Sequence, residues 1–279
     1  KNHPDVLARS RKEVLEHSRY FQAIYEQKKL TPFLPKNSPY KIEFSEELDD
    51  QSLIDRTKQD GCLTHLLLKG CVGITDRGLI EIAPHCGQLQ ALNLNDCLLI
   101  SRFGVHALLK QASNLSELYL RDVEPIEPSL LPADLDKLCD VSFDDAAMEV
   151  ALQTCPKLSL LKIYADKLTD RGLNSIGSSC KFLRTLHIQK AFHLTDSGLR
   201  ALIQAQPQLT HLLIEDAPHL TDSGLQDLKT TCIKLLYCIN CQQITDKCFE
   251  GLDLQFHALS NDAHQIVGSK FAGAPTYKI

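Results

Sequence analysis

A repeat with a nearly constant period runs through most of this chain. It is carried by the stretch Ile/Leu-Thr-Asp-x-Gly-Leu, which stands whole or in part at five places, and weaker copies extend the series. The aspartate position of the motif falls at residues 50, 76, 102, 145, 170, 196, 222 and 246, at intervals of 26, 26, 43, 25, 26, 26 and 24. Such a period is typical of a solenoid, in which each unit buries its apolar face only against its neighbours.

Each period is expected to form one short strand followed by one helix. A Leu-x-x-Leu-x-Leu stretch, such as Leu63, Leu66 and Leu68, supplies the strand, because its last two leucines lie on one strand face. The Thr-Asp pair fits a helix start, since either side chain can accept hydrogen bonds from free backbone N–H groups. Packed helices need more room than paired strands, so the stack must bend with its strands inside. We therefore predict an α/β solenoid with a parallel sheet on its concave face and helices on its convex face.

These motifs resemble the cysteine-containing leucine-rich repeats of F-box/leucine-rich-repeat proteins, which are substrate receptors of cullin-based ubiquitin ligases. The resemblance covers residues 37–252 and implies a curved horseshoe fold. It departs from the pattern at Ser101-Arg102, which replaces Thr-Asp, at Gln206, which replaces a cysteine, and at the interval of 43 residues. The cysteine column at the expected helix ends consists of Cys86, Cys155, Cys180 and Cys232.

Both ends of a solenoid need caps, because the terminal repeats would otherwise expose their apolar faces. Residues 1–36 are expected to form an N-terminal cap with a helix over residues 5–29, followed by a degenerate first strand at Tyr40, Ile42 and Phe44. Residues 253–279 are expected to be an irregular C-terminal cap or tail. Its apolar side chains are Phe256, Leu259, Ile266, Val267 and Phe271.

The N-terminal segment has a second interpretation. Ser18-Arg19-Tyr20-Phe21-Gln22-Ala23 resembles the Ser-x-Tyr-Phe-x-Ala helix of BTB domains, which also recruit cullins. No F-box pattern is visible beyond Phe33-Leu34-Pro35. Because residue 1 is Lys, we expect the numbering to start inside a longer polypeptide. Whether an F-box or BTB domain precedes Lys1 is left open by the sequence. Either resemblance implies contact between the N-terminal region and a cullin-ligase adaptor.

Composition narrows the classes of partner. Lys and Arg number 30 and Asp and Glu 35, so the net charge is −5, and the scattered basic residues give no support to nucleic-acid binding. No apolar run is long enough to predict a membrane span. The eleven cysteines recur at repeat spacing, which predicts buried thiols in a reducing compartment, the cytoplasm or nucleus.

Cofactor and metal sites are not expected. Cys238-x-x-Cys241 has a metal-ligand spacing, but Cys241 shares its repeat position with Cys71 and Cys97, and no second ligand pair matches. The chain has no phosphate-binding loop and no nucleophile elbow, so we predict that it is not an enzyme and takes no small-molecule substrate. A catalytic site assembled across repeats would use the strand histidines, which are His65, His187 and His211.

The hollow of the arc is the expected binding site for a protein partner. Strand residues that alternate with the buried leucines should face this hollow, and exposed apolar or aromatic residues there mark a protein-binding surface. At the last repeat, Leu235, Tyr237 and Ile239 could instead be covered by the C-terminal tail. The positions expected to contact the partner are Leu67, Asn93, Tyr119, Arg121, Leu160, Lys162, Tyr164, His187, His211, Leu213 and Tyr237.

The interval of 43 residues indicates an insertion at about residues 122–138. This stretch is rich in acids and contains three prolines, so we expect the chain to leave the solenoid here and rejoin it near Leu138. Its apolar residues Ile126, Leu130, Leu131 and Leu135 could form a lid over the hollow or contact a partner. A plain spacer is the alternative.

The leading hypothesis is a non-enzymatic recognition module that binds a protein partner on its concave face. The resemblance implies that this module selects substrates for a cullin-type ubiquitin ligase. One alternative is a structural or assembly subunit that docks by its convex helices. Another is a pathogen-derived mimic of a host ligase receptor, which the sequence does not distinguish from a host protein.

Overall fold

The computed structural model describes residues 41–43, 48–60, 63–254 and 256–260. The chain divides into two compact units, Lys1–Pro39 and Tyr40–Ile279, and the repeats lie in the second. The expected N-terminal helix, the BTB-like segment, two of the three expected first-strand residues (Tyr40 and Phe44) and the tail over residues 261–279 lie outside the described residues.

The described strands form one parallel sheet in which strand order follows chain order. Neighbouring repeats are in register, so that Leu66 pairs with Leu92 and Leu92 with Leu118. The sheet contains ten strands rather than the nine or so expected. These strands are β1 (Lys41–Glu43), β2 (His65–Leu67), β3 (Ala91–Asn93), β4 (Glu117–Tyr119), β5 (Lys137–Ser142), β6 (Leu160–Tyr164), β7 (Thr185–Gln189), β8 (His211–Glu215), β9 (Leu235–Ile239) and β10 (Phe256–Ser260).

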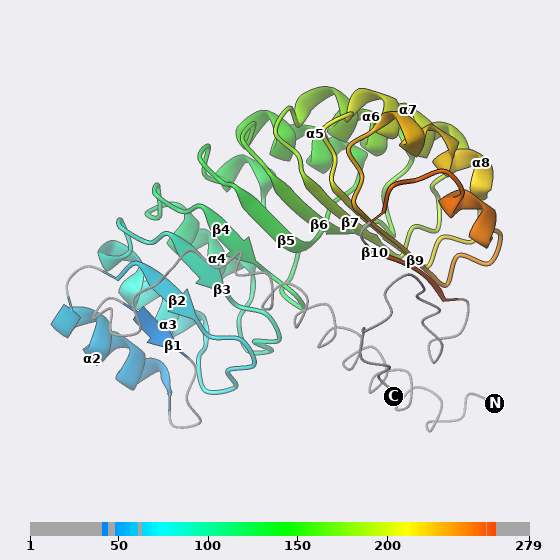
Figure 1. Ribbon diagram of the computed structural model, residues 1–279. Coiled ribbons are helices and arrows are strands. Elements are labelled where there is room, and N and C mark those ends of the chain that lie inside the picture. Colours follow the sequence, from blue (N-terminus) through cyan, green and yellow to red (C-terminus); the bar gives the residue numbers. More distant parts are fainter. Residues whose placement is uncertain (1–40, 44–47, 61–62, 255, 261–279) are drawn as a thin grey trace, which may run out of the picture. The chain divides into compact units, whose positions relative to one another are not determined.

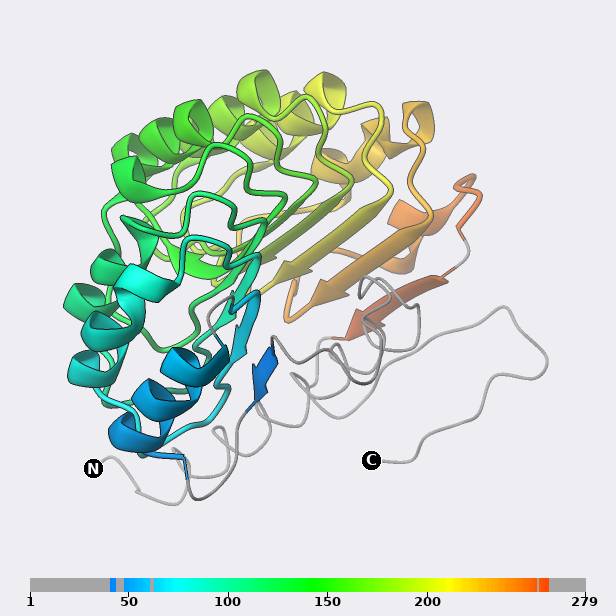
Figure 2. The same ribbon diagram turned by 90° about the vertical axis from the view of Figure 1, so that its left-hand side faces the viewer.

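Helices cover one face of this sheet and form the outer side of the curved stack (Figures 1 and 2). The predicted α/β solenoid is therefore confirmed. None of the described helices is long and apolar enough to cross a membrane. The helices are α2 (Asp50–Asp60), α3 (Asp76–Ile82), α4 (Arg102–Leu109), α5 (Asp145–Thr154), α6 (Asp170–Ser179), α7 (Asp196–Ala205) and α8 (Asp222–Leu225), with the 3₁₀ turns η1 (Ala83–His85), η2 (Pro128–Leu130), η3 (Gln226–Thr230) and η4 (Asp246–Phe249).

The threonine and aspartate of the motif join neighbouring repeats. Thr195 caps its own helix, because its Oγ1 accepts a hydrogen bond from the N–H of Ser197 at 3.3 Å. The aspartate of the previous repeat, Asp170, accepts two bonds from Thr195, from its N–H at 2.9 Å and its hydroxyl at 2.6 Å. The predicted capping role is thus confirmed for the threonine, while the aspartate caps the helix of the following repeat. We call this arrangement the aspartate clasp.

The glycine of the motif makes room for the clasp. At Gly104, a Cβ atom would lie 2.5 Å from Oδ1 of Asp76 and 3.1 Å from its Cα. The N–H of Gly104 also donates to Oδ1 of Asp76 at 3.2 Å. The motif therefore requires glycine because the preceding repeat's carboxylate occupies the space of a side chain.

The cysteine columns are buried, with one exception. The Sγ of Cys97 donates to the carbonyl of Leu68 at 2.9 Å, and that of Cys155 donates to Pro132 at 3.3 Å. Burial raises the pKa of Cys97 to about 11, so the thiol stays protonated at neutral pH. The expectation was wrong for Cys232, which is exposed, because α8 ends early and continues as the 3₁₀ turn η3.

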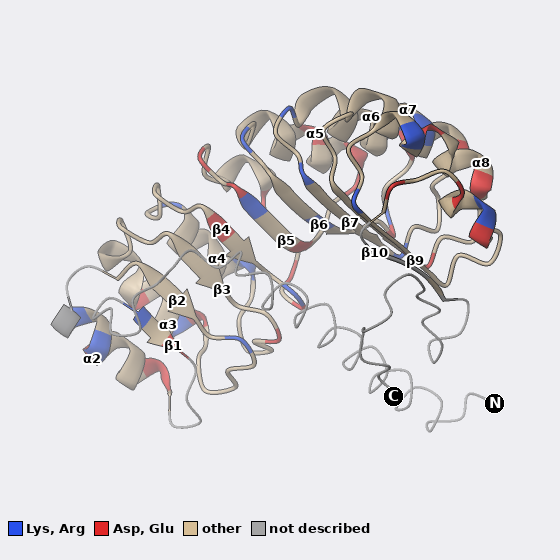
Figure 3. Cartoon of the chain, in the orientation of Figure 1, with Lys and Arg blue, Asp and Glu red and all other residues tan. Residues whose placement is uncertain are grey.

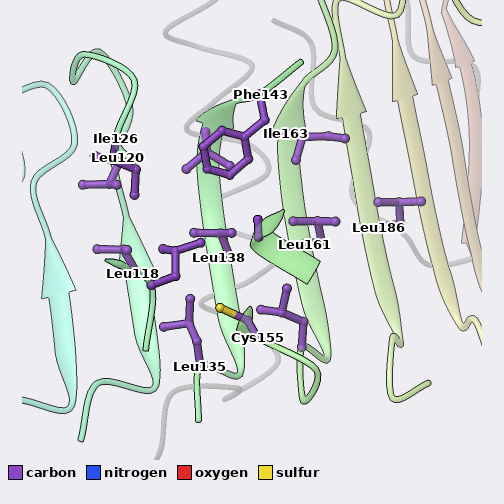
Figure 4. Packing of buried hydrophobic residues seen from close by; sticks show 14 of the residues in the cluster. Leu118, Leu120, Ile126, Leu135, Leu138, Phe143, Cys155, Leu161, Ile163 and Leu186 are labelled. Carbon is purple, nitrogen blue, oxygen red and sulfur yellow. The ribbon is translucent and has the colours of Figure 1, made fainter. Parts of the chain in front are cut away.

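The predicted insertion is wrong. Residues 121–136 complete a coil of the solenoid, because β4 pairs directly with β5 and Glu117 lies in register with Lys137. Ile126, Leu131 and Leu135 are buried in the common core (Figure 4). The interval of 43 residues therefore consists of two short coils, and the first has the 3₁₀ turn η2 in place of an α-helix. These apolar residues form neither a lid nor a free spacer.

The C-terminal end also differs from expectation. Residues 256–260 are not irregular but form β10, which pairs in parallel with β9. The strand adds backbone hydrogen bonds to an edge that would otherwise be open, which stabilises the last full repeat. The partly buried Leu259 packs against the core, as expected for a residue that covers the last repeat.

Candidate functional site

The concave face is formed by the strand side chains that point away from the helices. Eight of the eleven predicted positions are half-buried there, which leaves part of each side chain accessible. They are Leu67, Asn93, Tyr119, Arg121, Leu160, Lys162, Tyr164 and His211.

The other three predicted positions are buried, so the expectation that they are open to a partner was wrong. His187, Leu213 and Tyr237 are 1%, 3% and 2% exposed. His187 lies in register with Lys162 on one side and Leu213 on the other, and Leu213 lies in register with Tyr237. Large side chains on adjacent strands of a concave face converge and shield one another.

The two flanking positions of the last full repeat are buried as well. Leu235 and Ile239 are 4% and 5% exposed, so neither they nor Tyr237 present an open surface. The tail predicted to cover them is residues 253–279; its residues 256–260 form β10 beside β9, and residues 261–279 lie outside the described residues.

A network of charged side chains crosses the centre of the concave face. Asp140 lies at its middle, 2.6 Å from Nζ of Lys162 and 3.7 Å from a guanidinium nitrogen of Arg121. The amide of Asn95 donates to the other carboxylate oxygen of Asp140 at 3.3 Å. Figure 3 shows residues of both signs along β4, β5 and β6. The network thus brings together two predicted positions, Arg121 and Lys162, around an acid that was not predicted.

Electrostatics explain why a buried acid is tolerated here. Burial would raise the pKa of Asp140, whose side chain is only 3% exposed, but the charges of Lys162 and Arg121 outweigh burial and lower it. Asp140 therefore stays ionised at neutral pH and neutralises much of the positive charge around it. Burial also raises the pKa of the neighbouring Tyr164 phenol, which stays protonated.

A second charged pair lies beside this network. Nε2 of His187 lies 2.7 Å from Oε1 of Glu215, and Gln189 donates to the other oxygen of Glu215 at 2.8 Å. Burial lowers the pKa of His187 despite the attraction of Glu215, so the imidazole is neutral at pH 7 and donates to an ionised Glu215. Burial would raise the pKa of Glu215, but interactions with His187, Gln189 and Lys162 outweigh burial and lower this pKa to about 2.

Aromatic and aliphatic side chains lie among these charges. The hydroxyl of Tyr119 donates to Glu117 at 3.2 Å, and Glu117 also pairs with Lys137 at 2.6 Å. Nζ of Lys190 lies 5.1 Å from the ring centre of Tyr164. Half-buried rings held by polar contacts at their edges would lose little conformational freedom if this face were covered.

Catalytic chemistry finds little support in the described part of the chain. No group of three or more metal-ligating side chains occurs among the described residues. Of the three strand histidines considered, His65 and His187 are buried, and His211 lies 2.8 Å from its neighbour Thr210. The histidines lie on separate strands, and His65, like His211, contacts the hydroxyl of the threonine that precedes it.

Asp140 is the residue that sequence reasoning missed. It follows the predicted insertion at about residues 122–138 and was given no strand position, although Leu135-x-x-Leu138 matches the first two leucines of the strand pattern. Splitting the interval of 43 residues at this match would have placed Asp140 on a strand. The β-bulge that turns its side chain toward Arg121 and Lys162 has no signal in the sequence.

Burial of neutral His187 predicts a stability loss under mild acid. Because the folded-state pKa is lowered, its contribution is present above about pH 6.5 and is lost as the pH falls below that value. Between pH 7 and pH 5.5, wild type should lose about 1 kcal/mol more of its unfolding free energy than His187→Gln. Urea unfolding at each pH measures this difference.

The control is His193→Gln, because His193 lies on an exposed turn and should keep the wild-type profile. An unchanged slope in His187→Gln would show that His187 is not buried as a neutral group.

The parallel sheet, the outer helices and the Leu-x-x-Leu-x-Leu strands define a leucine-rich-repeat protein. No family model matches the chain. Two proteins of Arabidopsis thaliana are similar to it, both with F-box names. "F-box protein FBW2" is 31% identical over 117 residues, which is 42% of this chain and 33% of that protein. "Putative F-box/LRR-repeat protein 23" is 27% identical over 137 residues, 47% of this chain and 27% of that protein.

The match therefore spans about a third or less of these relatives. Among solved structures, a chain of the yeast Rad7 and Elc1 complex has the same fold, with a TM-score of 0.64 and 16% identity. That similarity covers 79% of this chain and 61% of the other. The resemblance to F-box/leucine-rich-repeat proteins is thus confirmed in the repeats, and the structural similarity shows the fold.

Proposed function

We propose that this chain is a non-enzymatic recognition module that binds a protein partner on its concave face. The observation that carries the proposal is the row of half-buried apolar and aromatic side chains among paired charges, formed by Leu67, Tyr119, Leu160 and Tyr164. Charges already paired within the protein cost little more to desolvate, while apolar rings and aliphatic groups gain from burial.

We further propose that the module selects substrates for a cullin-type ubiquitin ligase. This step rests on the F-box names of the two plant relatives, which match it over part of its length. The N-terminal region is the candidate contact for a ligase adaptor. Residues 1–40 lie outside the described residues, so this contact stays a prediction from sequence.

Replacing concave side chains should reduce partner binding without unfolding the protein. Tyr119→Ala combined with Leu160→Ala removes two half-buried side chains from β4 and β6, the strands on either side of β5. We expect at least about a tenfold loss of the captured partner, since truncation of an interface anchor costs more than about 1 kcal/mol. The measurement is quantitative mass spectrometry after affinity purification from cells, with folding checked by circular dichroism.

The matched control is Ile80→Ala with Val150→Ala, which removes two exposed apolar side chains from the outer helices. It should keep the partner at the wild-type level. Equal recovery with both double variants would contradict binding on the concave face. Recovery of partner without any cullin-adaptor subunit would contradict only the ligase assignment.

One observation favours a second function, docking into a larger assembly away from the concave face. Val72, Leu98, Leu99 and Phe103 are between 56% and 71% exposed and come from two consecutive repeats. Loss of partner with Leu98→Asp, and not with the concave variant, would support this alternative.

A further inference from the structure

The aspartate clasps divide the solenoid into two blocks. In the first block, Asp50 binds Thr75 and Asp76 binds Ser101, each through a hydroxyl at 2.6 Å. In the second, four consecutive clasps run from Asp145 to Thr245. Among the described residues no clasp joins the blocks, because Arg102 stands at the aspartate position and cannot accept a hydrogen bond.

The coil between the blocks, residues 121–143, is weakly held on the α4 side of the helical layer. The three-residue turn η2 stands where the other coils carry longer helical segments, and it separates α4 from α5. It packs against α5, where Cys155 also donates to the carbonyl of Pro132 at 3.3 Å. Toward α4 the described helical layer has little such packing, and the N–H of Glu127 donates to Nε2 of His106 at 3.0 Å. Ile126, Leu131 and Leu135 anchor the coil in the core. Helix-to-helix packing, which stiffens the rest of the solenoid, is therefore reduced between the first block and this coil.

On the inner side, Asp140 bridges the same gap. It lies inside β5 at a bulge, where Leu138 pairs with Leu161 but Val141 pairs with Ile163. Its φ of 62° is in the left-handed region, which costs free energy for a residue other than glycine. The carboxylate contacts Asn95 from the first block, Arg121 at the start of the coil itself and Lys162 from the second block.

We propose that residues 121–143 are the joint of the solenoid and that Asp140 is the positioning residue that holds the joint at one angle. Removing its charge leaves Arg121 and Lys162, 15% and 13% exposed, facing each other without the acid between them. Their repulsion then opens the inner side of a coil that has little helical packing toward α4 on its outer side. The proposal does not depend on partner binding.

The test is the distance between the two blocks in Asp140→Asn, which keeps the size of the side chain and tolerates a positive φ. Fluorescent labels at Ile80 and Phe182, which are 49% and 58% exposed, report this distance. The labels are introduced as unnatural amino acids because the chain contains eleven cysteines. We expect the distance distribution to widen about twofold and amide exchange over residues 120–143 to accelerate about tenfold.

The matched control is Asp196→Asn, which weakens a clasp inside the second block. It should accelerate exchange near Thr221 and leave the distance distribution unchanged. An unchanged distribution in Asp140→Asn, with circular dichroism intact, would overturn the proposal, and so would equal widening in the control.

A second variant covers the case in which Asp140→Asn does not fold. Asp140→Gly adopts the positive φ without strain and keeps both Arg121 and Lys162, so their repulsion remains. It should fold and show the wide distribution. A narrow distribution in this variant would overturn the proposal.

Discussion

Gly198→Ala is expected to lower the unfolding free energy by about 3 kcal/mol, although alanine is the better helix former. A Cβ at this position would lie 2.7 Å from the Cβ of Asp170 and closer still to its carboxylate. Asp170 cannot move away freely because it accepts two hydrogen bonds from Thr195. Urea unfolding monitored by circular dichroism measures the loss.

The matched control is Gly87→Ala, whose added Cβ would meet only the carbonyl of Gln111 at 4.0 Å. It should change stability by less than about 0.5 kcal/mol. A double-mutant cycle with Asp170→Ala isolates the clash, because the cost of Gly198→Ala should fall by more than about 1 kcal/mol once the carboxylate is gone. Full additivity of the two substitutions would show that the clasp does not set the requirement for glycine.

Gln206→Leu is expected to cost about 2 kcal/mol of unfolding free energy. Gln206 is fully buried at a position of the cysteine column, and its amide donates to the carbonyls of Ile176 and Gly177 at 3.3 Å and 2.9 Å. The carbonyl of Ile176 also accepts from the N–H of Cys180, but the last carbonyls of a helix lack partners within it, so the Gly177 carbonyl at the end of α6 depends on this donor from the next repeat. Leucine has a volume similar to that of glutamine but no hydrogen-bond donor. The substitution therefore removes the two hydrogen bonds and largely keeps the packing.

Gln204→Leu, on the exposed face of α7, is the control for the same chemical change. Its amide bonds only Asp227 at the surface, and it should change stability by less than about 0.5 kcal/mol. Gln206→Cys restores the residue type of the column and should fall between wild type and Gln206→Leu. If Gln206→Leu unfolded at the wild-type urea concentration, the carbonyls of α6 would not depend on Gln206.

The sequence predicted the features that repeat. Leucines at a fixed spacing specify which strand face is buried, because successive strand residues point to opposite faces. The Thr-Asp-x-Gly motif marked each helix start, and the structure shows that the aspartate and the glycine act between repeats rather than within one. Gln206 was identified as a departure from the cysteine column, but its role in holding α6 required coordinates.

The concave surface was predicted less well, since alternation gives the direction of a side chain and not its neighbours. His187 and Tyr237 were predicted to be open to a partner but are buried, and both lie in register with Leu213 on the strand between them. Whether such a side chain is half-buried or buried depends on neighbours from the next repeat, which lie 24 to 28 residues away in the chain. His187 and Glu215 are one such pair, and Leu213 and Tyr237 are another.

The period, the buried leucines and the helix starts were thus determined by the sequence alone, because local spacing specifies them in every repeat. Tertiary structure alone decided the coil of residues 121–143 and the position of Asp140. There the chain breaks its own period, and a bulge, a left-handed residue and three charges from separate coils meet only after the coils have stacked.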